Sequence, residues 1–443
     1  MKIDTGATAW MLAASALVLL MTPGLAFFYG GMTRAKSVLN MMMMSFVSIV
    51  TVTIAWVLYG HAFAFGTNGN STLNKVIGGV KEIGLQSLIN STQPTGTGDK
   101  TAIPSLVFSM FQLTFAIITV ALISGAIADR TKFGAWVVFT FAWATLVYFP
   151  VAHWVWGGGW LSQWGIEDFA GGTVVHVNAG AAGLALAFVL GKRKGWPKEP
   201  MRPHNLGYTL LGVGLLWFGW FGFNAGSEVG VDGTTALAFM NTQIATAVAA
   251  GSWIVVEKLR DGHATTLGCA SGAVAGLVAI TPACAFIDPW AAMLLGAVVG
   301  AVCAYAVGLK YKLGFDDSLD VVGVHLVGGA LGALSLGILA RYATAGTAQG
   351  QGLLYGHHGF KQLGLQALGP VAIGLYSFCM AWVIGKIIDK TIGFRIEEEE
   401  EVAGIDVAVH AESAYDLAPS HGGGALAAVS VAAASPAKVE AEA

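Results

Sequence analysis

Long apolar runs separated by short polar segments make up most of the chain. Each run is close to the roughly 20 residues that a helix needs to cross a membrane. The runs predict eleven membrane-spanning helices, at about residues 7–31, 38–65, 104–129, 133–154, 171–191, 206–227, 235–257, 265–286, 290–309, 320–340 and 363–388. Strands of a membrane barrel would alternate in polarity over about ten residues, and the runs show no such alternation. The expected fold class is therefore an all-α polytopic membrane protein.

The first run is predicted to stay in the protein as a membrane helix. A cleaved signal peptide starts with net positive charge and has a shorter apolar stretch. Here Lys2 is offset by Asp4, the run continues to Tyr29, and the next basic residues are Arg34 and Lys36. A removed signal peptide stays open as the weaker alternative.

Composition agrees with a membrane protein. Of the 443 residues, 55% are hydrophobic and only 11% are charged, whereas soluble globular chains carry about 25% charged residues. A soluble enzyme, a disordered chain and a nucleic-acid binder are therefore disfavoured. The net charge of −3 is unevenly distributed along the chain. Residues 389–443 hold three basic and eleven acidic residues, whereas residues 1–388 hold 20 basic and 15 acidic residues. We expect a transmembrane domain at 1–388 and a separate tail at 389–443.

The basic residues between the runs predict the orientation. Those that follow the odd-numbered runs, together with Lys386, number 14, and those on the other side number six. Basic loops tend to stay in the cytoplasm. The N-terminus is therefore expected outside and the C-terminus in the cytoplasm, which fits an odd number of helices.

Two histidines lie inside apolar runs at matching positions. His176 is in the fifth run and His325 is in the tenth, and each follows an aspartate, Asp168 or Asp317, by eight residues. The match predicts two five-helix repeats, runs one to five and six to ten, plus an eleventh helix. Five is an odd number, so the repeats would be inverted, and such repeats place a substrate site at their interface near the midplane. Two buried structural histidines are the alternative.

The chemistry of imidazole fits a polar path better than a metal site. Neutral imidazole has one donor and one acceptor nitrogen, and it titrates near pH 6.5, so two adjacent rings could share a proton. A metal site needs more ligands than two histidines, and the four cysteines have no paired spacing. We expect no metal and no cofactor.

Aromatic residues within the third run and at the ends of the fourth and sixth runs form a second candidate site, together with one serine. Its members are Phe111, Phe115, Trp156, Phe223 and Ser227. A tryptophan at the end of a membrane helix is most often part of an interfacial belt. Aromatic faces also attract cations, by about 2 kcal/mol when desolvated, and a nearby hydroxyl could accept an N–H. Such a site would bind a cation without a fixed carboxylate.

These motifs together resemble the ammonium transporter (Amt/Rh) family, and its bacterial Amt branch more than its animal branch. The resemblance covers about residues 7–416. The matching stretches are Pro23-Gly-Leu-Ala-Phe-Phe-Tyr-Gly-Gly31, Phe111-Gln-Leu-Thr-Phe115, His153-Trp-Val-Trp-Gly-Gly-Gly159, Asp168-Phe-Ala-Gly-Gly-Thr-Val-Val-His176, Trp220-Phe-Gly-Phe-Asn-Ala-Gly-Ser227, Thr281-Pro-Ala-Cys284 and Asp316-Asp-Ser-Leu-Asp-Val-Val-Gly-Val-His325.

The resemblance implies a role for each candidate residue in ammonium transport. It assigns outer ammonium recruitment to Phe111, Phe115, Trp156 and Ser227, a phenyl gate to Phe115 and Phe223, the pore centre to His176 and His325, and a mainly structural carboxylate to Asp168. It also implies a homotrimer in the bacterial inner membrane that takes up ammonium or ammonia as a nitrogen source. A PII-type signal protein would dock on the cytoplasmic tail.

Several alternatives stay open at this point. Transport could be electrogenic, which we favour, or the pore could be a passive channel for ammonia gas. An ammonium sensor or receptor and a transporter for another small amine are further possibilities, whereas an enzyme is not supported. In the tail, the acidic run Glu397–Glu401 is either a solvated segment or a docking surface, and residues after about 419 are expected to be disordered.

Overall fold

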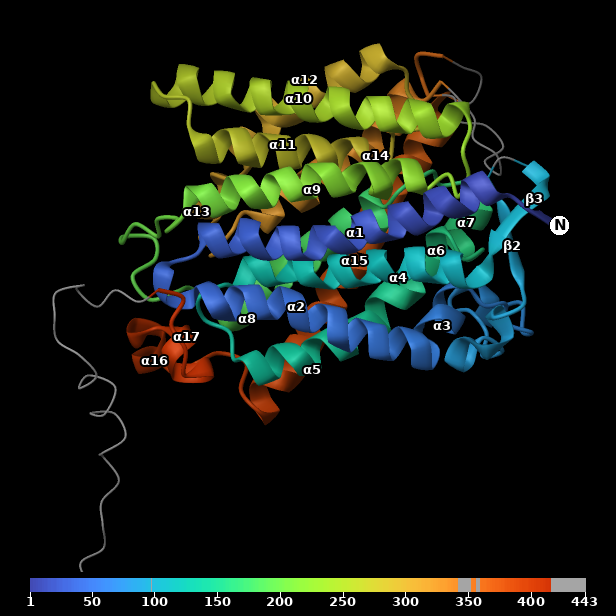
Figure 1. Cartoon of the computed structure of the whole chain (residues 1–443). Coiled ribbons are helices and arrows are strands. Elements are labelled where there is room, and N and C mark those ends of the chain that lie inside the picture. The colour runs from blue at the N-terminus through green and yellow to red at the C-terminus, as the bar shows by residue number, and fades with distance from the viewer. Residues whose placement is uncertain (97, 342–351, 356–358, 416–443) are drawn as a thin grey trace, which may run out of the picture.

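The computed structural model is a bundle of helices, and it describes residues 1–96, 98–341, 352–355 and 359–415. Figure 1 shows the long helices side by side, with their axes roughly parallel to one another. The helices are α1 Thr5–Met32, α2 Val38–Ala55, α3 His61–Phe65, α4 Ser105–Ile123, α5 Phe133–Trp143, α6 Phe149–Val155, α7 Trp160–Trp164, α8 Asn178–Leu190, α9 Leu206–Gly226, α10 Gly233–Asp261, α11 Thr266–Ile280, α12 Pro289–Ala306, α13 Leu309–Leu313, α14 Val327–Leu339, α15 Gly359–Thr391, α16 Glu398–Ala403 and α17 Ile405–His410.

The expectation of a helical membrane protein is confirmed. Within the described residues, ten helical stretches are long and apolar enough to cross a membrane. They are Thr5–Met32, Ala35–Phe65, Ser105–Ile127, Phe133–Trp164, Gly172–Leu190, Leu206–Gly226, Gly233–Asp261, Pro289–Leu313, Val322–Leu339 and Phe360–Thr391. Each lies on one of the predicted runs.

The remaining predicted run, 265–286, contains the shorter helix α11. This helix has 15 residues and ends at Ile280, and turns follow it to Phe286. Pro282 lies just beyond, and proline has no backbone N–H group with which to continue the helical hydrogen bonds. The count of eleven spans, the inverted repeats and the orientation therefore stay predictions.

Close backbone contact joins α1 and α9 along much of their length. A Cβ atom added at Gly31 would lie 2.5 Å from the backbone nitrogen of Thr209 and 2.6 Å from the carbonyl oxygen of Asn205. Small residues permit this approach between membrane helices. Glycine thus has a packing role in this bundle.

The two ends of the bundle carry different structures. A small sheet lies at one end, beside the N-terminus and α7 (Figure 1), with strand order β1-β3-β2. Its strands are β1 Lys2–Ile3, β2 Thr92–Thr95 and β3 Gly98–Pro104; β1 pairs with β3 in parallel and β2 pairs with it in antiparallel fashion. Helices α16 and α17 lie at the opposite end (Figure 1).

The start of the tail is docked on the bundle. The carboxylate of Asp406 in α17 accepts hydrogen bonds from the backbone N–H groups of Leu39 and Asn40, at 2.9 and 2.8 Å. These N–H groups belong to the first turn of α2, where no helical partner is available. Lys36 donates to the carbonyl of Val402 at 2.5 Å. The predicted disordered end after about residue 419 lies outside the described residues.

The acidic run at the start of α16 contains both buried and exposed side chains. Glu401 is 1% exposed and accepts hydrogen bonds from the Arg395 guanidinium at 2.7 Å and from the backbone N–H of Lys194 at 2.6 Å. Its neighbours Glu397, Glu398 and Glu399 are exposed. One member of the run therefore anchors the tail, while the others face solvent.

A buried ionic cluster lies near the tail end of the bundle. Arg193 binds Asp316 through its side chain at 2.9 Å and Asp129 at 3.1 Å. Arg130 is fully buried and reaches Asp316 at 3.9 Å, and Arg34 completes the cluster on Asp129 at 3.1 Å. Such charges are tolerated in the interior only while they are paired.

Candidate functional site

The two predicted pore histidines meet inside the bundle. Their Nδ1 atoms are 3.3 Å apart and their ring centroids are 5.4 Å apart. His176 is 1% exposed and His325 is 2% exposed. One Nδ1 must carry a proton and the other a lone pair for this contact to be a hydrogen bond. The pair therefore shares one proton between its facing nitrogens.

Both histidines lie on short π-helical turns that open a longer helix. The turn Gly172–Val177 carries His176 and leads into α8, and the turn Val322–Leu326 carries His325 and leads into α14. Such turns are rare and occur frequently at functional sites. The wider turn displaces a side chain from its regular helical position, and here it turns both rings toward each other.

Each π-helical turn is capped by the aspartate that precedes it. Asp168 accepts hydrogen bonds from the backbone N–H groups of Gly172 and Thr173, at 2.6 and 2.7 Å. Asp317 accepts from Val322 at 2.7 Å in the same way. A carboxylate is favoured at a helix N-terminus because the N–H groups there lack helical partners. The shared eight-residue spacing thus reflects a shared local structure.

A glycine contact brings the two histidine-bearing segments together. A Cβ atom added at Gly180 in α8 would lie 2.5 Å from the backbone nitrogen of Leu326. Leu326 follows His325 directly. Any larger residue at position 180 would push the second turn away and separate the rings.

A very small cavity adjoins the histidine pair. Its volume is about 10 Å³, and His176, His325, Trp220 and Phe223 are among its lining residues. A cavity needs about 10–15 Å³ to hold one water molecule. His176 stacks on Trp220 at 5.4 Å between centroids, and no described residue bonds its Nε2 atom. The cavity thus has room for about one molecule of water size beside a free ring nitrogen of His176.

Two stacked phenyl rings separate this cavity from a larger one. The rings of Phe115 and Phe223 have centroids 4.0 Å apart and are inclined by 25°. Phe223 lines the histidine cavity and Phe115 lines the larger cavity. Both rings are buried, at 1% and 0% exposed. The stack therefore closes the connection between the two spaces.

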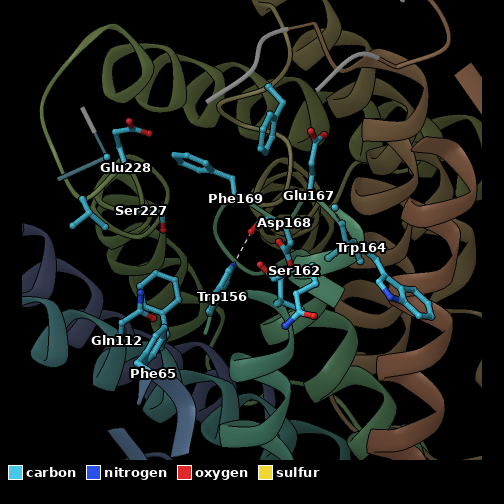
Figure 2. Close-up of a pocket in the computed structure, with 18 of the residues that line it drawn as sticks. Phe65, Gln112, Trp156, Ser162, Trp164, Glu167, Asp168, Phe169, Ser227 and Glu228 are labelled. Carbon is cyan, nitrogen blue, oxygen red and sulfur yellow. Dashed lines mark hydrogen bonds between the residues drawn. The ribbon is translucent and has the colours of Figure 1, made fainter. Parts of the chain in front are cut away.

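The larger cavity, which we call the vestibule, has a volume of about 660 Å³. Phe115, Trp156 and Ser227 all line it. Figure 2 shows Trp156 with its indole nitrogen directed at the Asp168 backbone, where it donates to the carbonyl oxygen at 2.8 Å. This bond fixes the indole ring beside Phe115, with centroids 6.1 Å apart. Three of the four expected recruitment residues therefore share one space.

The fourth expected recruitment residue lies behind the others. Phe111 is fully buried, and its ring packs on Phe115 with centroids 4.8 Å apart. It is not among the residues that line the vestibule. Phe111 therefore supports Phe115 from behind instead of offering its own face.

Ser227 has a hydroxyl that can still accept a hydrogen bond. Its Oγ donates to the carbonyl oxygen of Phe223 at 2.8 Å. A hydroxyl has one donor and two acceptor lone pairs, so the lone pairs remain for an incoming N–H group. The same bond ties Ser227 to the phenyl stack.

Sequence reasoning missed two acidic residues of the vestibule. Glu167 and Glu228 line it together with Asp168 (Figure 2). Burial raises the pKa of Glu167 to about 7. Burial, with a smaller contribution from the charge of Asp232, raises the pKa of Glu228 to about 8. Their positions in the sequence could have indicated them, since Glu167 directly precedes Asp168 and Glu228 directly follows Ser227.

Comparison with known proteins identifies the family. The model described as the Ammonium Transporter Family matches residues 9–415. An ammonium transporter of Mycobacterium bovis is 54% identical over 95% of this chain and 92% of its own length. An ammonium transporter of Bacillus subtilis is 47% identical over 93% of this chain and 99% of its own.

Solved structures agree with the sequence relatives. The crystal structure of Candida albicans Mep2 superposes with a TM-score of 0.82 at 34% identity, over 90% of this chain and 88% of that one. A structure described as a sensor Amt protein gives a TM-score of 0.81 at 28% identity, over 91% and 98% of the two chains. With the family model covering nearly all described residues, the chain belongs to the ammonium transporter family.

Proposed function

We propose that the chain takes up ammonium through a narrow pore in each subunit, in an electrogenic reaction. The vestibule, the phenyl stack and the histidine cavity would be consecutive stations of this pore. One observation carries the proposal: Phe115 and Phe223 are in contact, and each lines one of the two cavities. A molecule that passes between the rings goes directly from the vestibule to the histidines.

Recruitment in the vestibule depends on partial replacement of water around the cation. The indole of Trp156 and the ring of Phe115 offer aromatic faces, which attract a desolvated cation by about 2 kcal/mol. Ser227 would accept one N–H of the ion. Because these groups carry no charge, they can release the ion inward. Phe111 would hold the ring of Phe115 in place.

Passage beyond the phenyl gate favours loss of the proton. An unpaired cation in apolar surroundings carries a large desolvation cost, whereas neutral ammonia does not. His176 Nε2 could bond ammonia, and the contact to His325 could relay the proton separately. Asp168 would have a structural role and hold the π-helical turn in place, because its carboxylate accepts hydrogen bonds from the N–H groups of that turn.

The arrangement in the membrane is part of the proposal. We propose eleven transmembrane helices in two inverted five-helix repeats, with the vestibule outside and α16 and α17 in the cytoplasm of a bacterial cell. The matching aspartate, π-helical turn and histidine in both halves support the repeats. A homotrimer, with a transmembrane domain at 1–388 and a regulatory tail at 389–443, completes the expected architecture.

A current measurement tests the electrogenic mechanism. Liposomes that contain the purified protein are expected to show an inward current after an ammonium jump, because net transfer of one charge is worth about 2.3 kcal/mol per 100 mV. Protein-free liposomes are the control. Uptake without current would contradict the electrogenic mechanism and favour a passive ammonia channel. Saturable binding without uptake would favour an ammonium sensor.

The docked tail is proposed to receive a PII-type signal protein. The exposed glutamates beside Glu401 would supply the contact surface, while Glu401 and Asp406 hold the helices in place. In a pull-down with a PII-type protein, the full chain is expected to bind and a chain shortened to 1–388 is not. A chain shortened to 1–415 is the matched control and should bind. Equal binding by all three chains would place the partner elsewhere.

A further inference from the structure

The vestibule contains two buried carboxyl groups that the transport mechanism does not use. Glu167 is 3% exposed and Glu228 is 4% exposed, and both line the cavity. Figure 2 shows them on two sides of the cavity, with Phe169 between them in the view. They come from separate segments, one before the π-helical turn of His176 and one directly after Ser227. The space they share is the one that would receive the cation.

Glu167 lacks a partner in a place where it needs one. Its Oε2 atom is buried and accepts no hydrogen bond from any described residue. A buried carboxylate without a partner is costly, so this group either keeps a proton or binds a cation from the cavity. The pKa values of about 7 and about 8 for Glu167 and Glu228 put that choice within the physiological pH range.

The other charged and titratable groups that line the vestibule or lie near it do not satisfy these carboxyls. Asp168 is held by backbone N–H groups, Asp232 caps α10, and Cys284 is a buried thiol. Lys361 of α15 lines the same cavity and makes no described ion pair with Glu167 or Glu228. The vestibule therefore has two acidic groups open to exchange.

We infer that the carboxyl groups of Glu167 and Glu228 form an outer subsite of the vestibule that binds small ammonium-type cations in exchange for the carboxyl proton. The subsite deepens the proposed function and rests on it. The balance is simple: the cation binds, one carboxyl O–H bond breaks, and the proton leaves to the external water. The subsite concentrates the cation in front of the neutral aromatic site, and it does so more strongly as the pH rises.

The first test is the pH dependence of methylammonium uptake. Raised pKa values mean that the glutamates ionise as the pH rises through about 7 and about 8, so proton competition weakens there. In the wild-type chain, KM is expected to fall by about tenfold between about pH 6 and about pH 8.5, as for a competing proton with a pKa near 7. In E167Q/E228Q, KM is expected to be high and independent of pH. E82Q is the matched control, because Glu82 is a glutamate of the same end of the molecule that does not line the vestibule.

The second test observes the proton directly and does not require transport. Infrared difference spectra of the wild-type protein in detergent at about pH 7 are expected to lose the carbonyl stretch of a protonated carboxyl group when ammonium is added. The band should shrink in E167Q and in E228Q and be absent in the double variant. No band change in the wild-type protein would overturn the subsite, whatever the variants do.

The two tests separate the inference from the proposed function. A double variant with the wild-type KM and the wild-type pH profile overturns the subsite and leaves ammonium transport standing. An infrared change in a protein that takes up no methylammonium and no ammonium would instead support the subsite and contradict transport.

Discussion

The double variant H176A/H325A is expected to lose at least about tenfold of its selectivity for ammonium over potassium. The two rings are the polar groups of a cavity whose other named walls are aromatic, and they meet at 3.3 Å. Two lost hydrogen bonds of about 1 kcal/mol each exceed the 1.4 kcal/mol that corresponds to a factor of ten. Removal of both rings also enlarges the cavity, so that a hydrated cation meets less resistance.

The measurement is the ratio of ammonium to potassium currents in liposomes at a clamped potential. H263A serves as the control, because His263 is an exposed histidine on the loop after α10. Unchanged selectivity in the double variant would remove the histidine pair from the mechanism. Reduced ammonium flux with unchanged selectivity would leave the pair a role in conduction alone.

The variant D316A is expected to lose about 3–5 kcal/mol of stability, the cost of removing one partner from a buried ion pair. Asp316 is fully buried, and Arg193 contacts it through its backbone N–H at 2.8 Å and its guanidinium at 2.9 Å. Loss of the carboxylate leaves the charges of Arg193 and Arg130 without enough partners in the interior. The effect should extend to the whole bundle, because the cluster joins four separate segments of the chain.

Thermal unfolding in detergent measures this loss. The matched control is D261A, since Asp261 pairs with Arg260 at 2.7 Å on the exposed surface, with side chains 49% and 36% exposed. An exposed pair contributes little, so the control should unfold at the wild-type temperature. Equal unfolding temperatures for D316A and D261A would show that the buried cluster does not stabilise the fold.

The apolar runs predicted most of the fold because length and hydrophobicity alone specify a membrane helix. The details that the runs missed have local causes. Helix α11 is shorter than its run, since Pro282 lacks the N–H group that would continue the helix, while the residues beyond it are still apolar. The hydrogen bonds of the π-helical turns at His176 and His325 span one residue more than those of an α-helix. An apolar sequence gives no sign of that change.

The candidate site was predictable for residues that belong to long motifs. It was less predictable where the position of a residue depends on which segments lie close together in the fold. Trp156, Phe115 and Ser227 meet in the vestibule as expected, yet Phe111 lies behind it. The burial of Glu167, Glu228 and Glu401 was hidden, because an acidic residue in a predicted loop normally faces water. Only the three-dimensional arrangement shows that Glu167 and Glu228 line a cavity and that Glu401 pairs with an arginine.

The phenyl stack has a consequence for the kinetics of the pore. With centroids 4.0 Å apart, Phe115 and Phe223 leave no passage for a molecule of water size between them. In the proposed pore, each transfer would therefore wait until a ring swings aside and returns. The maximal flux through the proposed pore would then be limited by the rate at which these two side chains open, as well as by the ammonium concentration outside.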